Sequence, residues 1–287
     1  MPTLFEFLAD SGFIDRERAA LVSERCRDAE VPVYRDPISG VIFLDPAKAG
    51  LDELYYAKRD SGAVAHPRTE TDVLDATRRS ALLTPLISGR RWVDFACGPG
   101  YQLRADARTA AAHLGVELNQ ADLALLSADG FAVTPELKDV EDFRPDVISI
   151  FHAIDQIDEA PAVLADLHRA AAPGGELVIE GVHANDWLLT NAPESFLRFT
   201  FTAEHLVLHT RASLRALVES AGWQVTEVVG VQRYPLGNHL AWLGQGRPTG
   251  MRAHLHDATE LALHDAYAAF LAARDQTDTL VLRARKQ

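Results

Sequence analysis

From about residue 70 onward, the hydrophobic and polar positions alternate between two patterns. Short continuous apolar runs bounded by small or polar residues are typical of buried strands. Segments with apolar residues three or four positions apart lie between these runs and predict amphipathic helices. The predicted strands are the run around Trp92 and residues 115–118, 131–133, 145–151, 176–180, 223–229 and 279–284. Strands that alternate with helices predict a doubly wound α/β domain, with a mostly parallel sheet covered on both faces.

The beginning of the chain lacks this alternation. Residues 1 to about 30 predict helix, and residues 31–46 predict two short strands around a Pro/Ser/Gly turn. We therefore expect a small α+β cap over residues 1–74, with the doubly wound domain over residues 75–287.

One loop carries the strongest chemical signal. The run Arg91–Tyr101 reads RWVDFACGPGY, so a strand ends in an acid and a small-residue loop opens the next helix. Gly98 and Gly100 leave out side chains where a ligand would approach the backbone. Asp94 stands where it can order the loop or receive a cationic ligand group. Because open parallel sheets bind ligands at their first βα turn, the loop predicts a nucleotide-type site.

This loop resembles motif I of class I S-adenosylmethionine-dependent methyltransferases, usually written Val-x-Asp-x-Gly-x-Gly-x-Gly, with Ala96 in place of the first glycine. The resemblance covers the whole domain from residue 75. It implies a seven-stranded sheet whose last strand, residues 279–284, is antiparallel. Residues 231–275, which separate the sixth and seventh strands, are then an insertion.

Residues 204–210 and 232–243 are similar to a bacterial subgroup of these enzymes, found among surface-polysaccharide and natural-product pathways. Many members of that subgroup carry a cysteine-rich zinc site near the N-terminus. This chain has only Cys26 and Cys97, so we expect no metal and no disulfide framework.

Two other functions remain open. A nicotinamide-dependent oxidoreductase would have Gly-x-Gly-x-x-Gly, but Leu103 stands at the third glycine position and Asp94 ends the strand. A non-catalytic protein that binds S-adenosylmethionine or its demethylated product, S-adenosylhomocysteine, would carry the same loop. Motif I reports binding rather than turnover.

The resemblance also implies a set of cofactor contacts. Glu117 would accept hydrogen bonds from the ribose hydroxyls, and Asp139 would meet the adenine amine. A tyrosine hydroxyl and an arginine would bind the methionine carboxylate. Other roles remain open: the acids could be solvated side chains, and the tyrosine could pack the cap onto the main domain. The candidates are Tyr56, Arg79, Asp94, Ala96, Gly98, Gly100, Glu117, Leu118, Asp139, Val140 and Phe151.

Aromatic and polar residues follow the later strands, at the sheet edge where the pocket must lie. Apolar walls with a few polar anchors are typical of small-molecule sites. His205 is the first candidate general base and His152 the second, although either side chain could instead only hydrogen-bond the substrate. The candidate acceptor contacts are His183, Trp187, Arg233, Tyr234, Asn238 and His239.

Composition limits the kinds of partner that the protein is expected to bind. The net charge is −13, from 41 acidic residues against 28 Lys and Arg, which argues against a nucleic-acid surface. The N-terminus lacks the pattern of a signal peptide, and no apolar run approaches the roughly 20 residues that cross a bilayer. We expect a cytoplasmic enzyme with a small-molecule substrate, and the sequence leaves a homodimer open.

Overall fold

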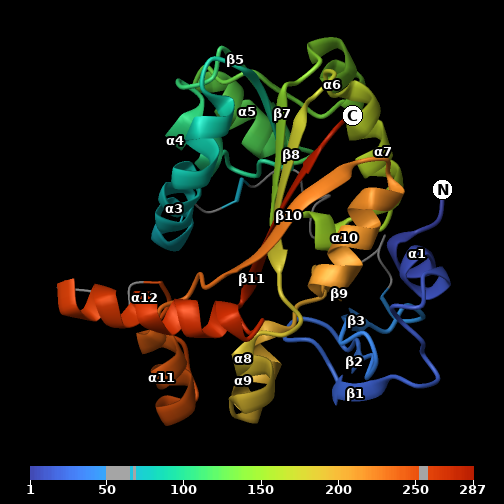
Figure 1. Cartoon of the computed structure of the whole chain (residues 1–287), viewed down its shortest axis with the longest axis vertical. Helices are drawn as coiled ribbons and strands as arrows, with labels where there is room; N and C mark the ends of the chain where they lie inside the picture. Colours follow the sequence, from blue (N-terminus) through green and yellow to red (C-terminus); the bar gives the residue numbers. More distant parts are fainter. Residues whose placement is uncertain (50–64, 67–68, 252–257) are drawn as a thin grey trace.

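The computed structural model describes residues 1–49, 65–66, 69–251 and 258–287. Tyr56 therefore lies outside the described residues. The main sheet has seven strands in the order β10-β11-β8-β7-β4-β5-β6 (Figure 1). They are β4 (Arg91–Phe95), β5 (Ala112–Val116), β6 (Val133–Thr134), β7 (Val147–Phe151), β8 (Glu176–Val182), β10 (Gln224–Val231) and β11 (Thr279–Arg285). Only β11 is antiparallel to its neighbours, so the predicted fold is confirmed.

Helices cover both faces of this sheet. They are α3 (Glu70–Ile87), α4 (Tyr101–Asp106), α5 (Gln120–Ala128), α6 (Leu137–Phe143), α7 (Ala160–Ala170) and α10 (Arg211–Ser220). Adjacent strand positions point to opposite faces, so Trp92 packs with Leu83 and Leu126 while Val93 joins the core that contains Leu164 and Leu214. The doubly wound arrangement follows directly from the near-continuous apolar strands.

Local sequence signals set several helix ends. Pro161 lies in the first turn of α7, where its missing N–H costs nothing. Thr210 and Ser213 form a reciprocal cap at the start of α10.

The N-terminal segment begins with α1 (Leu4–Asp10) and then contributes β1 (Ala20–Ser23), β2 (Val33–Arg35) and β3 (Ile42–Leu44) to a second sheet. The predicted helix to residue 30 is wrong beyond Asp10, because Gly12 turns at φ +74° and β1 pairs with β2. The two strands predicted within residues 31–46 are confirmed. The fourth strand, β9 (Val207–Leu208), comes from beyond residue 74, so this sheet joins the N-terminal segment to a segment that follows β8.

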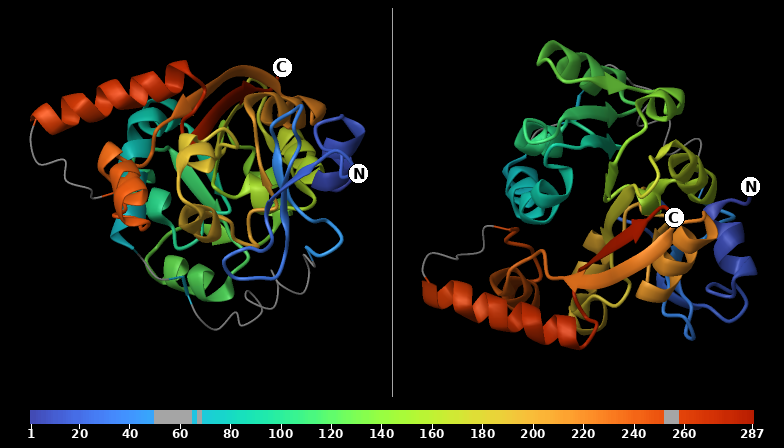
Figure 2. Two further views of the ribbon diagram at one scale, coloured as in Figure 1. Left: turned by 90° about the horizontal axis from the view of Figure 1, so that it is seen from below. Right: turned by 45° about the horizontal axis from the view of Figure 1, so that its top comes forward.

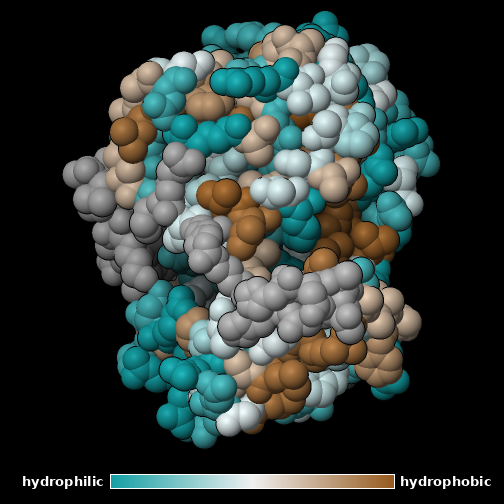
Figure 3. Space-filling model, turned by 90° about the vertical axis from the view of Figure 1, so that its left-hand side faces the viewer, coloured by the Kyte–Doolittle hydropathy of each residue, from teal (hydrophilic) through white to brown (hydrophobic). Residues whose placement is uncertain are grey.

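The insertion folds as α11 (Leu236–Gln245) and α12 (Ala258–Ala273), beside α8 (Trp187–Asn191) and α9 (Glu194–Thr200). Helix α12 extends away from the sheet in every view (Figures 1 and 2). The face drawn in Figure 3 shows hydrophobic residues both near its middle and in its lower part. Exposed apolar side chains on α11 and α12 are Leu240, Leu243, Leu261, Leu263 and Phe270. Within the described residues, no helix has the length and apolar character that a bilayer crossing requires.

Candidate active site

A pocket of about 1030 Å³ opens at the carboxyl edge of the parallel strands. Its walls include Ala96 and Gly98 after β4, Glu117 and Leu118 after β5, and His152 after β7. Loops at this edge meet because parallel strands all end there. The structure therefore brings together four of the predicted cofactor residues and one of the two predicted bases.

Gly98 and Gly100 have different structural roles in the loop that follows β4, which is called the first loop below. The backbone has positive φ at Ala96, Gly98 and Gly100, at +55°, +54° and +76°. A Cβ on Gly98 would meet nothing within 4 Å, so this position leaves space open within the pocket. A Cβ on Gly100 would lie 2.3 Å from the side chain of Leu126, so Gly100 is required for packing against α5. Gly100 is not among the residues that line the pocket.

Glu117 ties this loop to the next one. Its Oε2 accepts a hydrogen bond from Gly98 N at 2.8 Å. Its Oε1 accepts from Leu118 N at 2.8 Å and from Asn119 N at 2.9 Å. The carboxylate is only 3% exposed, yet it borders the pocket. It is therefore fixed in place before any ligand arrives.

Asp94 lies beneath the loop rather than in the pocket wall. It is 3% exposed, and its Oδ1 accepts a hydrogen bond from the Ser149 hydroxyl on β7 at 2.7 Å. Burial raises the pKa of Asp94 to about 7, against the lowering effects of the Ser149 bond and the charge of Arg79. This position supports ordering of the loop, and direct contact with a ligand stays a prediction.

The predicted adenine contacts lie off the pocket. Asp139 accepts a hydrogen bond from the Thr134 hydroxyl at the end of β6, and Val140 is fully buried in the core. The pocket wall here consists instead of residues 135–137, including the exposed acid Glu136. The sequence held a signal for this wall, because residues 135–137 directly follow a strand that ends beside Glu117.

Two carboxylates and three arginines form a buried charged cluster at the same sheet edge. Glu180 on β8 accepts hydrogen bonds from Arg78 Nη2 and Arg79 Nε, all at 2.8 Å. Asp75 on α3 accepts from Arg78 Nη2 at 2.7 Å and from Arg79 Nη2 at 2.8 Å. Arg233 Nε, after β10, lies 2.7 Å from Asp75 Oδ2. Arg79 and Arg233, predicted to bind cofactor and acceptor, thus meet in one cluster, and those roles stay predictions.

His152 connects the cluster to the pocket. Its Nε2 lies 3.1 Å from Glu180 Oε1, and its backbone has φ +51°, which is unusual for a residue with a side chain. Burial, followed by the charge of Arg233, lowers the pKa of His152, although Glu180 opposes this shift. The Arg79 guanidinium lies 4.8 Å from the ring centre of Phe151, so Phe151 packs the cluster rather than lining the pocket.

His205 forms a separate pair. Its Nδ1 contacts Asp155 Oδ2, and the side chain of Asp155 is 1% exposed. Burial would lower the pKa of His205, but the charge and hydrogen bond of Asp155 raise it above the ordinary value. The neighbouring residues Glu204 and Leu206 line the pocket, whereas His205 itself does not.

Two of the predicted acceptor residues, Asn238 and His239, pack in and around the insertion. Asn238 is 3% exposed, and its Oδ1 accepts from Thr249 N at 3.0 Å and Gly250 N at 3.1 Å. His239 is 1% exposed and stacks on Trp187, with 6.0 Å between ring centres. Neither of these two helix α11 side chains borders the pocket, because hydrogen bonds and stacking turn them inward.

The remaining two acceptor candidates also lie off the pocket. His183 is fully buried, and its Nδ1 lies 2.9 Å from the Thr277 carbonyl oxygen. The Tyr234 backbone N–H donates to Asp278 at 2.8 Å, which places Tyr234 beside the start of β11. The acceptor roles of these residues stay predictions.

The sequence model of a family described as "Methyltransferase domain" matches residues 68–228, which is more than half of the chain. The chain belongs to this methyltransferase family. Ubiquinone biosynthesis O-methyltransferase from Hahella chejuensis is 24% identical over 131 residues, which is 42% of this chain and 52% of that protein. The methyltransferase described here thus spans about half the length of this curated relative.

One solved structure supports the fold. A SAM-dependent methyltransferase from Archaeoglobus fulgidus superposes with a TM-score of 0.52 at 14% identity, over 81% of this chain and all of that one. Another, from Mesorhizobium loti, gives a TM-score of 0.46 at 17% identity, over 72% and 96% of the two chains. This methyltransferase thus has the fold of S-adenosylmethionine-dependent enzymes, which implies S-adenosylmethionine as the cofactor.

The residues present fit that cofactor. Gly98 leaves its side-chain volume empty inside the pocket of the methyltransferase, and the fixed carboxylate of Glu117 borders the same space. Glu117 accepts backbone N–H groups from two loops, and a carboxylate is an acceptor type that suits ribose hydroxyls. The pocket is thus built for a hydroxylated ligand beside the first loop.

The sequence did not predict one part of the pocket wall, nor the two buried carboxylates that pair with His152 and His205. Thr69, Asp72 and Tyr101 border the pocket, and Tyr101 Oη accepts a hydrogen bond from Thr69 N at 2.9 Å. A tyrosine directly after the glycine loop was the available signal. Asp155 and Glu180, the partners of the two histidines, lie 50 and 28 residues from them, and no local pattern pairs residues at such separations.

Proposed function

We propose that this methyltransferase moves the methyl group of S-adenosylmethionine to a hydroxyl of a small molecule. The observation that carries the proposal is the pocket of about 1030 Å³, which extends from the loop after β4 to the four-stranded sheet of β1, β2, β3 and β9. Ligand pockets typically measure about 300–1,000 Å³, so this one suits two ligands side by side.

The cofactor half is the side bordered by Ala96, Gly98, Glu117 and Leu118. When bound there, S-adenosylmethionine supplies an activated methyl group on a positively charged sulfur. Glu117 orients the ribose, and the open position at Gly98 admits the ligand against the backbone. Asp94 orders the loop from below through Ser149.

The acceptor half lies toward the small sheet. Val31 and Leu44 of the cap, with Ile157 and Leu206, supply apolar walls, and Arg27 adds a cation at the rim. Apolar walls with few polar groups suit a flat or partly apolar acceptor. The cap therefore contributes directly to the selection of the acceptor.

A hydroxyl is the acceptor group that the histidines favour. A neutral hydroxyl loses its proton as it attacks, and a positioned base typically contributes 10²- to 10⁴-fold to such a step. His152 and His205 each have one ring nitrogen beside a buried carboxylate, which orients the ring. The name of the Hahella relative, an O-methyltransferase, supports oxygen as the attacked atom.

Calorimetry tests the cofactor half. We expect dialysed protein to bind S-adenosylmethionine and S-adenosylhomocysteine but not NAD, and Gly98→Val to lose that binding. Gly174→Val is the matched control, because Gly174 also has positive φ and open space but lies in the turn before β8, at the opposite sheet edge. Binding of NAD alone, or unchanged affinity in Gly98→Val, would overturn the assignment.

Turnover tests the acceptor half. Purified enzyme with methyl-labelled S-adenosylmethionine is offered hydroxyl acceptors (3,4-dihydroxybenzoate, quercetin and methyl α-rhamnoside) and amine acceptors (tyramine and histamine). We expect label to pass to at least one hydroxyl compound and not to the amines. Transfer to amines alone would contradict an oxygen acceptor, and binding without any transfer would favour a non-catalytic role.

A further inference from the structure

The backbone of His152 is held in a conformation that points its ring between the pocket and the charged cluster. It follows β7 directly, and its N–H donates to the Glu180 carbonyl oxygen at 2.7 Å. A positive φ on a residue with a β-carbon costs free energy and persists where surrounding contacts enforce it. The same two residues thus meet twice, once through the backbone and once through the side chains.

Glu180 is an unusually well-braced carboxylate. It is fully buried, and Arg78 and Arg79 donate three hydrogen bonds to its two oxygens. Burial alone would raise the pKa of Glu180, but the contact with His152 and the charges of the two arginines hold it well below its usual range. The group beside His152 therefore stays negatively charged.

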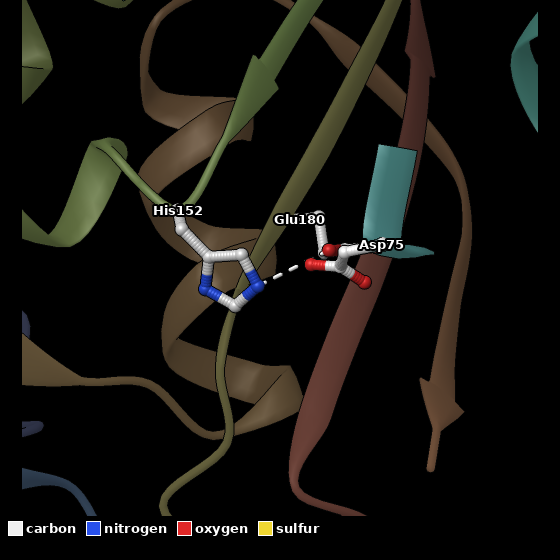
Figure 4. Close-up of side chains that lie close together, drawn as sticks. All are labelled: Asp75, His152 and Glu180. Atoms are coloured by element: carbon white, nitrogen blue, oxygen red, sulfur yellow. Dashed lines mark ion pairs between the residues drawn. The ribbon is translucent and has the colours of Figure 1, made fainter. Parts of the chain in front are cut away.

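The ring of His152 is asymmetric in its surroundings. Nε2 faces Glu180 at 3.1 Å, whereas Nδ1 lies on the side of the ring away from both carboxylates (Figure 4). Within the described residues, Nε2 has no well-aligned hydrogen-bond partner, so this bent contact with Glu180 is its polar contact. A carboxylate beside one ring nitrogen of a histidine favours the tautomer that carries the proton on that nitrogen.

Asp75, His152 and Glu180 also lie close enough to hold a metal ion, with ligand atoms within 4.8 Å of one another (Figure 4). The two carboxylates are instead paired with Arg78, Arg79 and Arg233. A cation would have to displace those guanidinium groups, so the cluster suits orientation of His152 better than metal binding.

We propose that Glu180 is the positioning residue for His152, which it holds with the proton on Nε2 so that Nδ1 acts as the general base toward the pocket. The inference rests on the proposed function. The acceptor O–H bond breaks and its proton goes to Nδ1, while the oxygen electron pair forms the bond to the methyl carbon. The carbon–sulfur bond breaks with its electron pair left on the thioether product. The resulting imidazolium faces the Glu180 carboxylate.

The choice of His152 as the general base reverses the order in the sequence analysis, where His205 is the first candidate and His152 the second. His205 has the better-defined carboxylate contact, but its ring does not border the pocket, whereas His152 does. The pair of His205 with Asp155 instead connects the segment before β9 to the loop after β7. A base must reach the proton that it removes, so access decides between them.

The tautomer can be measured without an acceptor. Protein labelled with ¹⁵N-histidine gives two-bond nitrogen–hydrogen correlations, with His152 assigned from the signal lost in His152→Asn, a residue that tolerates positive φ. We expect neutral His152 with the proton on Nε2 at pH 7. Glu180→Gln should mix the two tautomers. Asp75→Asn is the matched control, because it removes one charge from the same cluster but leaves the His152 partner, and should keep the Nε2–H form.

A proton on Nδ1 in the wild-type enzyme would overturn the proposal, even if Glu180→Gln failed to fold. An unchanged tautomer in folded Glu180→Gln would also overturn it. Turnover gives a second reading, with the best hydroxyl acceptor from the labelled panel. His152→Gly should lower kcat by roughly 10²- to 10⁴-fold with S-adenosylmethionine affinity within about twofold, and added imidazole should restore part of the rate.

His205→Ala supplies the comparison. We expect a smaller loss of kcat and no rescue by imidazole. A larger loss than in His152→Gly at equal cofactor affinity would transfer the base role to His205. Failure of wild-type protein to bind S-adenosylmethionine, or to methylate any compound, would instead be a failure of the proposed function.

Discussion

Glu117 does two jobs with one carboxylate. It receives three backbone N–H groups from two loops and borders the pocket. A glutamine there would turn an NH₂ group toward at least one of these donors, leaving a buried group without its partner. The residue therefore shapes the loop as well as any ribose contact.

We expect Glu117→Gln to weaken S-adenosylmethionine binding by about 1.5–3 kcal/mol, the scale of a hydrogen bond to a charged group. Calorimetry measures the change, with Glu159→Gln as a control that removes a charge from the same pocket wall. An analogue that lacks both ribose hydroxyls should lose less than the natural cofactor. Equal losses would show that Glu117 acts through the loop alone.

Prediction from sequence worked best for residues that a strand places directly. Ala96 and Gly98 follow one predicted strand, Glu117 and Leu118 end the next, and all four border the pocket. Asp139 sits farther along, inside α6, where the helical turn points it at Thr134. A residue's register after the strand thus decides its direction, and sequence alone fixes that register only close to the strand end.

At the scale of elements, α11 is the clearest departure from the sequence hypothesis. Its polar residues were expected to face the acceptor, but they hold the helix to its own surroundings. Asn238 receives two backbone N–H groups from the loop that follows α11, and His239 contacts the Tyr267 hydroxyl on α12 at 2.9 Å. Polar residues within an apolar insertion can serve its internal packing, and composition does not separate the two uses.

We expect Asn238→Ala to lower the free energy of unfolding by about 1–3 kcal/mol, the scale of two lost hydrogen bonds, because the backbone N–H groups of Thr249 and Gly250 lose their acceptor. Urea denaturation measures the change. Leu240→Ala lies on the same helix with its side chain exposed and should change stability little. A raised KM for the acceptor with unchanged stability would instead restore the acceptor role.

For the whole molecule, a pair of buried acids joins segments that are far apart in the sequence. Asp186 caps α8 by accepting from Leu188 N. Asp278, just before β11, accepts from the Gln232 side chain and from two backbone N–H groups that follow β10. Burial, followed by repulsion from Asp278, raises the pKa of Asp186. Burial also raises the pKa of Asp278. Ionisation of the pair therefore opposes folding.

The sign of the pH effect follows. Protonated Asp186 contributes its full share to the free energy of unfolding below the ordinary aspartate pKa of 3.8. That contribution is lost as the pH rises through the higher pKa of Asp186 in the folded protein. We expect Asp186→Asn, which keeps a good cap, to gain stability relative to wild type as pH rises from 5 to 8. Denaturation at several pH values measures this. Asp10→Asn, at an exposed position, should show no such trend, and a constant difference for Asp186→Asn would contradict the prediction.

Sequence predicted the order of strands and helices well, because each strand carries its own apolar run. It could not predict contacts between segments far apart in the chain. Glu180 meets Arg78 across 102 residues, and β3 pairs with β9 across more than 160. Such pairings depend on how the sheets stack, which no local window contains.

The pairing of β3 with β9 has a consequence for engineering. Phe43 lies opposite Val207, and β9 begins two residues after His205. A graft that exchanged only residues 1–46 with a homologue would place a foreign strand edge against the native β9, and would disturb the segment that carries His205. Acceptor preference should transfer between enzymes only when residues 1–46 and 201–209 are exchanged together, as one unit that is discontinuous in the gene.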